Sequence, residues 1–118
     1  MKFGIFYELQ IPRPWERHSE HKLLNDALTQ VELADRLGYD MAWEVEHHYL
    51  EEYSHSSAPG VFLAAASQRT KNIRLGHGIT LMPPKYNHPA RVAASTPIVA
   101  ISRPLRRPPS GQHRTSPY

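Results

Sequence analysis

Three apolar stretches alternate with two amphipathic ones along the first 80 residues. Residues 3–7 form a continuous apolar run that predicts a strand buried on both faces, and residues 41–46 and 73–81 predict two more strands. Between the first two strands we expect a helix that starts at a Ser19 cap and ends at Gly38. Its apolar residues recur at spacings of three and four: Leu24, Ala27, Leu28, Val31, Ala34 and Leu37.

A second helix is predicted between the second and third strands. Ser57 followed by Pro59 is typical of a helix start, and the alanine-rich segment 64–66 carries the helix to about Arg69. Two prolines, at 83 and 84, end the third strand, and residues 88–91 indicate the start of a third helix. The order strand, helix, strand, helix, strand is the βα repeat of a parallel α/β fold.

This pattern fails after residue 93. Arginine and serine replace the apolar period there, and five prolines interrupt any helix: Pro97, Pro104, Pro108, Pro109 and Pro117. We therefore expect an α/β domain over residues 1–93 and a disordered Pro/Arg/Ser-rich tail over residues 94–118.

The formal net charge of +3 also belongs to the tail. Residues 1–93 hold ten Lys and Arg against eleven Asp and Glu, whereas the tail holds four arginines and no acid. The tail lacks interleaved aromatic residues and an amphipathic period, so we expect neither a nucleic-acid nor a membrane partner. The apolar run 3–7 is too short for a signal peptide or a membrane span. With no cysteine to form disulfides, the chain is predicted to be cytoplasmic.

Candidate chemistry gathers where the second predicted strand ends. Glu46, His47 and His48 follow its apolar residues, and ligands bind beyond the carboxyl ends of parallel strands. A simpler interpretation is that the two histidines begin a loop and are satisfied by backbone or water. A metal site is a further alternative, but adjacent histidines with scattered partners give poor ligand spacing, so no metal is expected.

Four segments in order show a family resemblance. They are the opening 1–6, the helix-to-strand junction 37–43 with the following 46–48, the segment 75–83 (LGHGITLMP), and His88-Pro89. With these segments, residues 1 to about 93 resemble the bacterial luciferase-like family of flavin-dependent monooxygenases. The resemblance implies a (β/α)8 TIM barrel, which takes about 250 residues or more, so this chain would supply three βα units of a truncated barrel.

The same resemblance implies a cofactor and roles for named residues. Reduced FMN, or in some branches a deazaflavin, would act with a small-molecule substrate such as an aldehyde. His47 would be the catalytic acid or base, with His48 as a neighbouring catalytic residue and Glu46 binding the cofactor or orienting an imidazole. Gly76, Gly78 and Ile79 would pack against the flavin ring, with a cis peptide expected between Gly78 and Ile79.

Other interpretations of these residues stay open. The glycines could instead mark a tight strand crossing. Glu8 and the loop that contains Trp15 would line the substrate side, an expectation that rests on their position alone.

Three strands leave two open edges, so we expect impaired or no activity from the chain alone. The alternative function is a non-catalytic barrel fragment that associates through exposed strand edges, and a homo-oligomer is possible.

Overall fold

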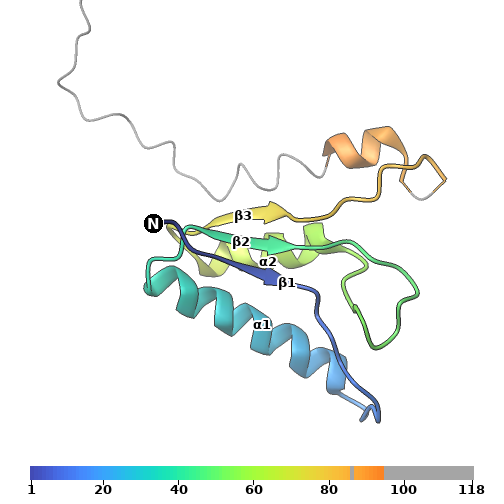
Figure 1. Ribbon diagram of the computed structural model, residues 1–118, viewed down its shortest axis with the longest axis horizontal. Coiled ribbons are helices and arrows are strands. Elements are labelled where there is room, and N and C mark those ends of the chain that lie inside the picture. The colour runs from blue at the N-terminus through green and yellow to red at the C-terminus, as the bar shows by residue number, and fades with distance from the viewer. Residues whose placement is uncertain (86, 95–118) are drawn as a thin grey trace, which may run out of the picture.

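The computed structural model describes residues 1–85 and 87–94, which form a parallel sheet covered on one face by two helices (Figure 1). The strands are β1 (Gly4–Tyr7), β2 (Met41–Glu44) and β3 (Arg74–His77), and they lie in the order β1-β2-β3. Both strand pairs are parallel, and Trp43 is in register with residue 6 on one side and residue 76 on the other. The predicted parallel βα order is confirmed.

The strands are shorter than the apolar runs that predict them. β2 ends at Glu44 rather than at residue 46, and β3 ends at His77 rather than at residue 81. One further ladder contact follows β3, because the Gly78 N–H donates to the Glu44 carbonyl at 2.7 Å. Beyond that point the chain is held by side chains instead of a neighbouring strand.

The helices are α1 (Ser19–Arg36) and α2 (Pro59–Arg69), close to the predicted spans. Ser19 is the first helical residue instead of the cap, and its hydroxyl accepts from the Glu16 N–H at 2.9 Å. Pro59 opens α2 as predicted, since proline at the first turn leaves no donor unsatisfied. Gly38 follows α1 with φ of +82°, a conformation that glycine adopts without a Cβ clash.

Asp35 joins the end of α1 to the start of β3. Its two carboxylate oxygens accept from the backbone N–H groups of Lys71 (2.7 Å), Asn72 (2.8 Å) and Ile73 (2.6 Å). Burial alone would raise the pKa of Asp35, but these hydrogen bonds and the nearby Lys71 charge outweigh it and lower the pKa. This carboxylate fixes how the helix layer meets the third strand.

The two faces of the sheet differ in burial. The helix-covered face holds the core, whose buried residues are Leu9, Ala27, Leu28, Val31, Ala34, Ala42, Phe62, Leu63, Ala66, Ile73 and Leu75. On the opposite face Phe6 is 54% exposed and Trp43 is 37% exposed. Within the described residues, neither outer edge of the sheet has a partner strand.

Residues 89–94 are helical, which agrees with the predicted start of a third helix (Figure 1). The predicted disordered tail lies outside the described residues, except for residue 94. Among the helices of the described ranges, none is both long and apolar enough to cross a membrane.

Candidate functional site at the carboxyl ends of the strands

Glu8 and His47 meet just beyond the ends of β1 and β2. The His47 Nε2 atom lies 3.5 Å from Glu8 Oε2, an ion-pair distance if the imidazole is protonated. The two atoms do not form a hydrogen bond, and each is buried with no hydrogen-bond partner in the described part of the chain. The His47 N–H donates to the Ser56 carbonyl at 2.9 Å, and the imidazole packs edge-on against Tyr53.

The side of the sheet on which this pair lies follows from strand alternation. Successive strand residues point to opposite faces, so Glu8 continues the face of Phe6, the open face of the sheet. His47 lies beside Glu8, and its Nε2 has no hydrogen-bond partner among the described residues. That nitrogen and the neighbouring carboxylate are suited to accept or donate a proton. The predicted position of this imidazole at the mouth of a barrel stays a prediction.

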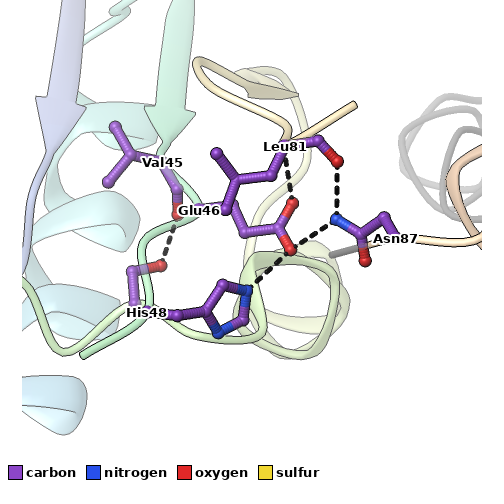
Figure 2. Close-up of polar contacts among 6 residues, drawn as sticks. Val45, Glu46, His48, Leu81 and Asn87 are labelled. Atoms are coloured by element: carbon purple, nitrogen blue, oxygen red, sulfur yellow. Dashed lines mark hydrogen bonds and ion pairs between the residues drawn. The ribbon is translucent and has the colours of Figure 1, made fainter. Parts of the chain in front are cut away.

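Glu46 lies in a network of polar contacts with His48, Leu81 and Asn87 (Figure 2). It is 4% exposed, and its Oε1 accepts from the Asn87 amide at 2.8 Å and contacts His48 Nε2 at 3.0 Å. Its Oε2 accepts from the Leu81 N–H at 3.0 Å, and the Asn87 amide also donates to the Leu81 carbonyl. Glu46 therefore joins the end of β2 to the segment after β3, and the imidazole it contacts is that of His48, not His47.

The ionisation of Glu46 follows from these contacts. Burial alone would raise the pKa of the carboxyl group, but the hydrogen bonds from Asn87, Leu81 and His48 outweigh it and lower the pKa. A carboxylate that remains ionised holds His48 and the residue-81 backbone in place. In this structure Glu46 and His48 are positioned to support the site, whereas direct contact with a cofactor stays a prediction.

Gly76 and Gly78 lie against aromatic side chains of the open face. A Cβ added at Gly76 would meet the Trp43 ring at 2.6 Å, and one at Gly78 would meet the Phe6 ring at 2.6 Å. The glycines thus leave room for these two rings. This packing agrees with the tight-crossing interpretation, and it makes Trp43 and Phe6 the groups that cover the glycine backbone.

The expected cis peptide between Gly78 and Ile79 is not present. Among the described residues, the only cis bond is Arg13–Pro14. A cis bond that does not precede proline costs about 2.5–4 kcal/mol and needs surrounding contacts that impose it. Here the Gly78 N–H continues the ladder to Glu44, and the chain leaves β3 in trans geometry.

Glu44 is a buried carboxyl group that the sequence did not single out. It is 0% exposed, and the Ser56 hydroxyl donates to its Oε1, while Oε2 has no hydrogen-bond partner among the described residues. Burial raises the pKa of Glu44 to about 7, with the Ser56 hydrogen bond opposing and the Glu8 charge adding to the rise. Burial and then Glu44 also raise the pKa of Tyr7 to about 12. The sequence offered one signal for Glu44, its position directly after Trp43 in the predicted second strand. Because successive strand residues point to opposite faces, Glu44 faces the helices when Trp43 faces away from them.

The candidate metal ligands do not assemble. Within the described ranges, no group of three or more His, Cys, Asp or Glu side chains is arranged to hold a metal ion. Three of the histidines instead make separate contacts, each with a different carboxylate. His47 lies beside Glu8, His48 beside Glu46, and His55 beside Glu20.

A parallel βα sheet with a histidine–carboxylate pair beyond its strand ends is consistent with the class of α/β enzymes that bind ligands at that edge. The family model of luciferase-like monooxygenases matches residues 1–97. The chain therefore belongs to the luciferase-like monooxygenase family, as the resemblance indicated.

Two curated relatives and one solved structure show the range of similarity. The chain is 39% identical over 93 residues to limonene 1,2-monooxygenase of Rhodococcus erythropolis, covering 77% of this chain and 22% of that protein. It is 30% identical over 108 residues to the oxygenase component of flavin-dependent trigonelline monooxygenase of Acinetobacter baylyi, covering 87% and 28%. Monooxygenase RslO1 of Streptomyces bottropensis superposes with a TM-score of 0.70 at 35% identity, covering 86% and 30%. The chain thus spans less than a third of each of these proteins.

Proposed function

We propose that residues 1–94 form the first βα units of a (β/α)8 barrel that acts as a flavin-dependent monooxygenase on a small organic molecule. The observation that carries this proposal is the pair of Glu8 and His47, 3.5 Å apart beyond the carboxyl ends of two adjacent parallel strands. Family membership supports the general kind of reaction. The trigonelline enzyme, a relative at 30% identity, is named as flavin-dependent.

The residues of the open face fit a planar, redox-active group. Phe6 and Trp43 expose aromatic surface beside two glycines, and His47 Nε2 and Glu8 Oε2 are buried polar atoms without hydrogen-bond partners in the described residues. Reduced FMN, with a deazaflavin as the alternative, would supply the electrons for dioxygen chemistry. Barrels of this kind usually bind the cofactor phosphate with late loops, which are not among the described residues.

In this proposal the chain's own groups control protons and water. His47 moves a proton at Nε2, the ring atom that faces Glu8. Glu8 stabilises the protonated imidazole by its charge. Tyr53 packs against the same ring and limits access of water to it. Glu46 and His48 hold the loop from which His47 projects, so we assign them positioning roles.

Anaerobic titration with reduced FMN tests the proposal. We expect saturable quenching of tryptophan fluorescence in the high micromolar range, because three βα units provide only part of a barrel site. His47→Ala should weaken the affinity by about 3- to 10-fold, the effect of losing one hydrogen bond. Gly78→Val should weaken it as well, since the added side chain displaces Phe6. Absence of quenching at high micromolar flavin would contradict a flavin site on this chain.

A second candidate function is association without catalysis. Among the described residues both sheet edges lack a partner strand, and Phe6 and Trp43 are exposed on the open face. Unpaired edges and exposed apolar surface favour pairing with another chain. The same titration separates the two candidates, because an association module would not bind flavin saturably.

A further inference from the structure

A cavity lies on the helix-covered face of the sheet, away from the open face that carries Trp43. Its volume is about 380 Å³, and its lining residues come from α1, α2 and the segment that precedes α2, together with Leu9 and Glu44. Glu44 is next to Trp43 in β2, and alternation therefore turns it to the opposite face. The cavity is thus separate from the Glu8–His47 pair.

The walls of this cavity are mainly apolar. They include six apolar side chains from the two helices and the loop after β1: Leu9, Leu24, Leu28, Val61, Phe62 and Ala65. The volume is within the range of natural small-molecule sites, about 300–1,000 Å³. Such walls would bury a short alkyl or aryl group.

The polar lining residues are Glu20, Glu44, His55, Ser56 and Ser57, and two of them carry a buried atom without a hydrogen-bond partner among the described residues. Glu44 is 0% exposed and its Oε2 has no hydrogen-bond partner in the described residues. His55 also lines the cavity, with Nε2 buried and without a partner there, while its Nδ1 lies 3.3 Å from Glu20 Oε1. A buried polar atom without a partner costs about 1–3 kcal/mol, so two of them beside one cavity indicate a missing polar occupant.

The sign of the charge decides the kind of occupant. Two carboxylates, Glu44 and Glu20, line the cavity, and no Lys or Arg does. The N-terminal end of α2 contributes a positive charge of only about half a unit, which does not offset them. Burial and the charge of Glu8 raise the pKa of Glu44 to about 7, and a bound cation would relieve that cost of ionisation.

We propose that this cavity is a binding site for a small hydrophobic amine, with the ammonium group at Glu44 and the hydrocarbon part among the helix side chains. The ammonium N–H groups would donate to the free Glu44 oxygen. A neutral alcohol of the same length would fill the walls but would not form the charged hydrogen bond. A carboxylic acid of the same length would be repelled.

Three six-carbon probes at pH 8 test this proposal on the full chain. Hexylamine, hexanol and hexanoate each contain six carbons and carry a cationic, a neutral and an anionic head group, and binding is followed by shifts of backbone amide NMR signals. We expect hexylamine to saturate and to bind at least about tenfold more tightly than hexanol, because charge-assisted hydrogen bonds are the stronger kind. Hexanoate should not saturate. The shifts should gather at residues 44, 55–58 and 61–65.

Substitutions connect the probe to this cavity. Glu44→Gln keeps the size of the side chain and an oxygen for the Ser56 hydroxyl, and should weaken hexylamine binding at least about tenfold. Ala65→Leu fills the cavity and should weaken both hexylamine and hexanol. Glu32→Gln removes a carboxylate that pairs with Arg69 and does not line the cavity, and should leave the affinity within about twofold.

Several outcomes would overturn the proposal. They are equal affinity for hexylamine and hexanol, unchanged hexylamine affinity in Glu44→Gln, and absence of saturable binding by any probe, which would mean that the cavity holds water only. The comparison of the three probes uses the unmodified chain, so it decides the question even if a variant does not fold. None of these results depends on flavin binding.

Discussion

The six-membered ring of Trp43 occupies the space beside Gly76, where an added Cβ would lie 2.6 Å from Trp43 Cζ3. These residues are in register on adjacent strands, so the absence of a side chain at one position permits the large ring at the other. Gly78, the residue that follows β3, likewise leaves room for the ring of Phe6, which lies on β1 at the other edge of the sheet. One glycine of β3 and one just beyond it therefore shape the aromatic open face that we assign to the flavin.

We predict that Gly76→Ala destabilises the chain by about 1–3 kcal/mol, the usual cost of overpacking. The Trp43 ring must move, and its contact with the sheet is lost. The midpoint of urea unfolding measures the effect. As a control, Gly76→Ala combined with Trp43→Ala should cost less than the sum of the single changes, since the clash is absent. Equal stability of Gly76→Ala and the unmodified chain would show that the ring is not packed there.

Glu44→Gln should change how stability depends on pH. The pKa of Glu44 is raised from 4.5 to about 7, so between these values the folded chain keeps a proton that the unfolded chain releases. Stability of the unmodified chain therefore falls as the pH rises from 4.5 through 7. The variant lacks this loss. The free energy of unfolding of the variant minus that of the unmodified chain should therefore be about 1–3 kcal/mol larger at pH 8 than at pH 4.5. A difference independent of pH, measured by urea unfolding, would refute the assignment.

Asp35→Asn should have the opposite pH signature. The pKa of Asp35 is lowered below 3.8, so its contribution to stability is fully present above that value and is lost as the pH falls through the folded pKa. Asparagine offers one acceptor oxygen to three N–H groups, and we expect a loss of about 1.5–3 kcal/mol at pH 7. The difference in free energy of unfolding between the two proteins should become smaller in acid. A difference that is the same at pH 7 and pH 3, measured by urea unfolding, would argue against the three backbone hydrogen bonds.

Exposed strand edges lead to a prediction about association. Burial of a large apolar side chain contributes about 1.5–3 kcal/mol, and the open face leaves Phe6 and Trp43 partly in water. We expect sedimentation velocity to show self-association that increases with protein concentration. Phe6→Lys should reduce it by placing a charge on the open face. A monodisperse monomer with strongly protected amides would contradict this prediction.

The elements of the fold could be predicted because their signals are local. The apolar run before Glu8, the periodicity before Gly38 and Pro59 at the second helix each act within a few residues. The position of His47 beyond the second strand followed from the parallel order of the elements. Strand ends were less predictable, since the apolar pattern continues after residue 77 while the hydrogen-bond ladder stops at Gly78.

The contacts within the site could not be predicted, because they depend on loops far apart in the chain. Glu46 binds Asn87, 41 residues away, through a segment without periodicity. In the sequence, Glu44 is one of several polar residues near a strand end, and only the structure shows that it is buried under the helices. The Gly78–Ile79 cis bond was expected from family resemblance alone and is absent.

The central claim is that the open face of this sheet receives a flavin, and the position of the two tryptophans tests it directly. Trp15→Phe leaves Trp43 as the only fluorescent indole, and Trp43→Phe leaves Trp15. On anaerobic titration with reduced FMN, quenching should remain saturable in Trp15→Phe and largely disappear in Trp43→Phe. Quenching that is lost with Trp15 and kept without Trp43 would place the flavin elsewhere and contradict the claim.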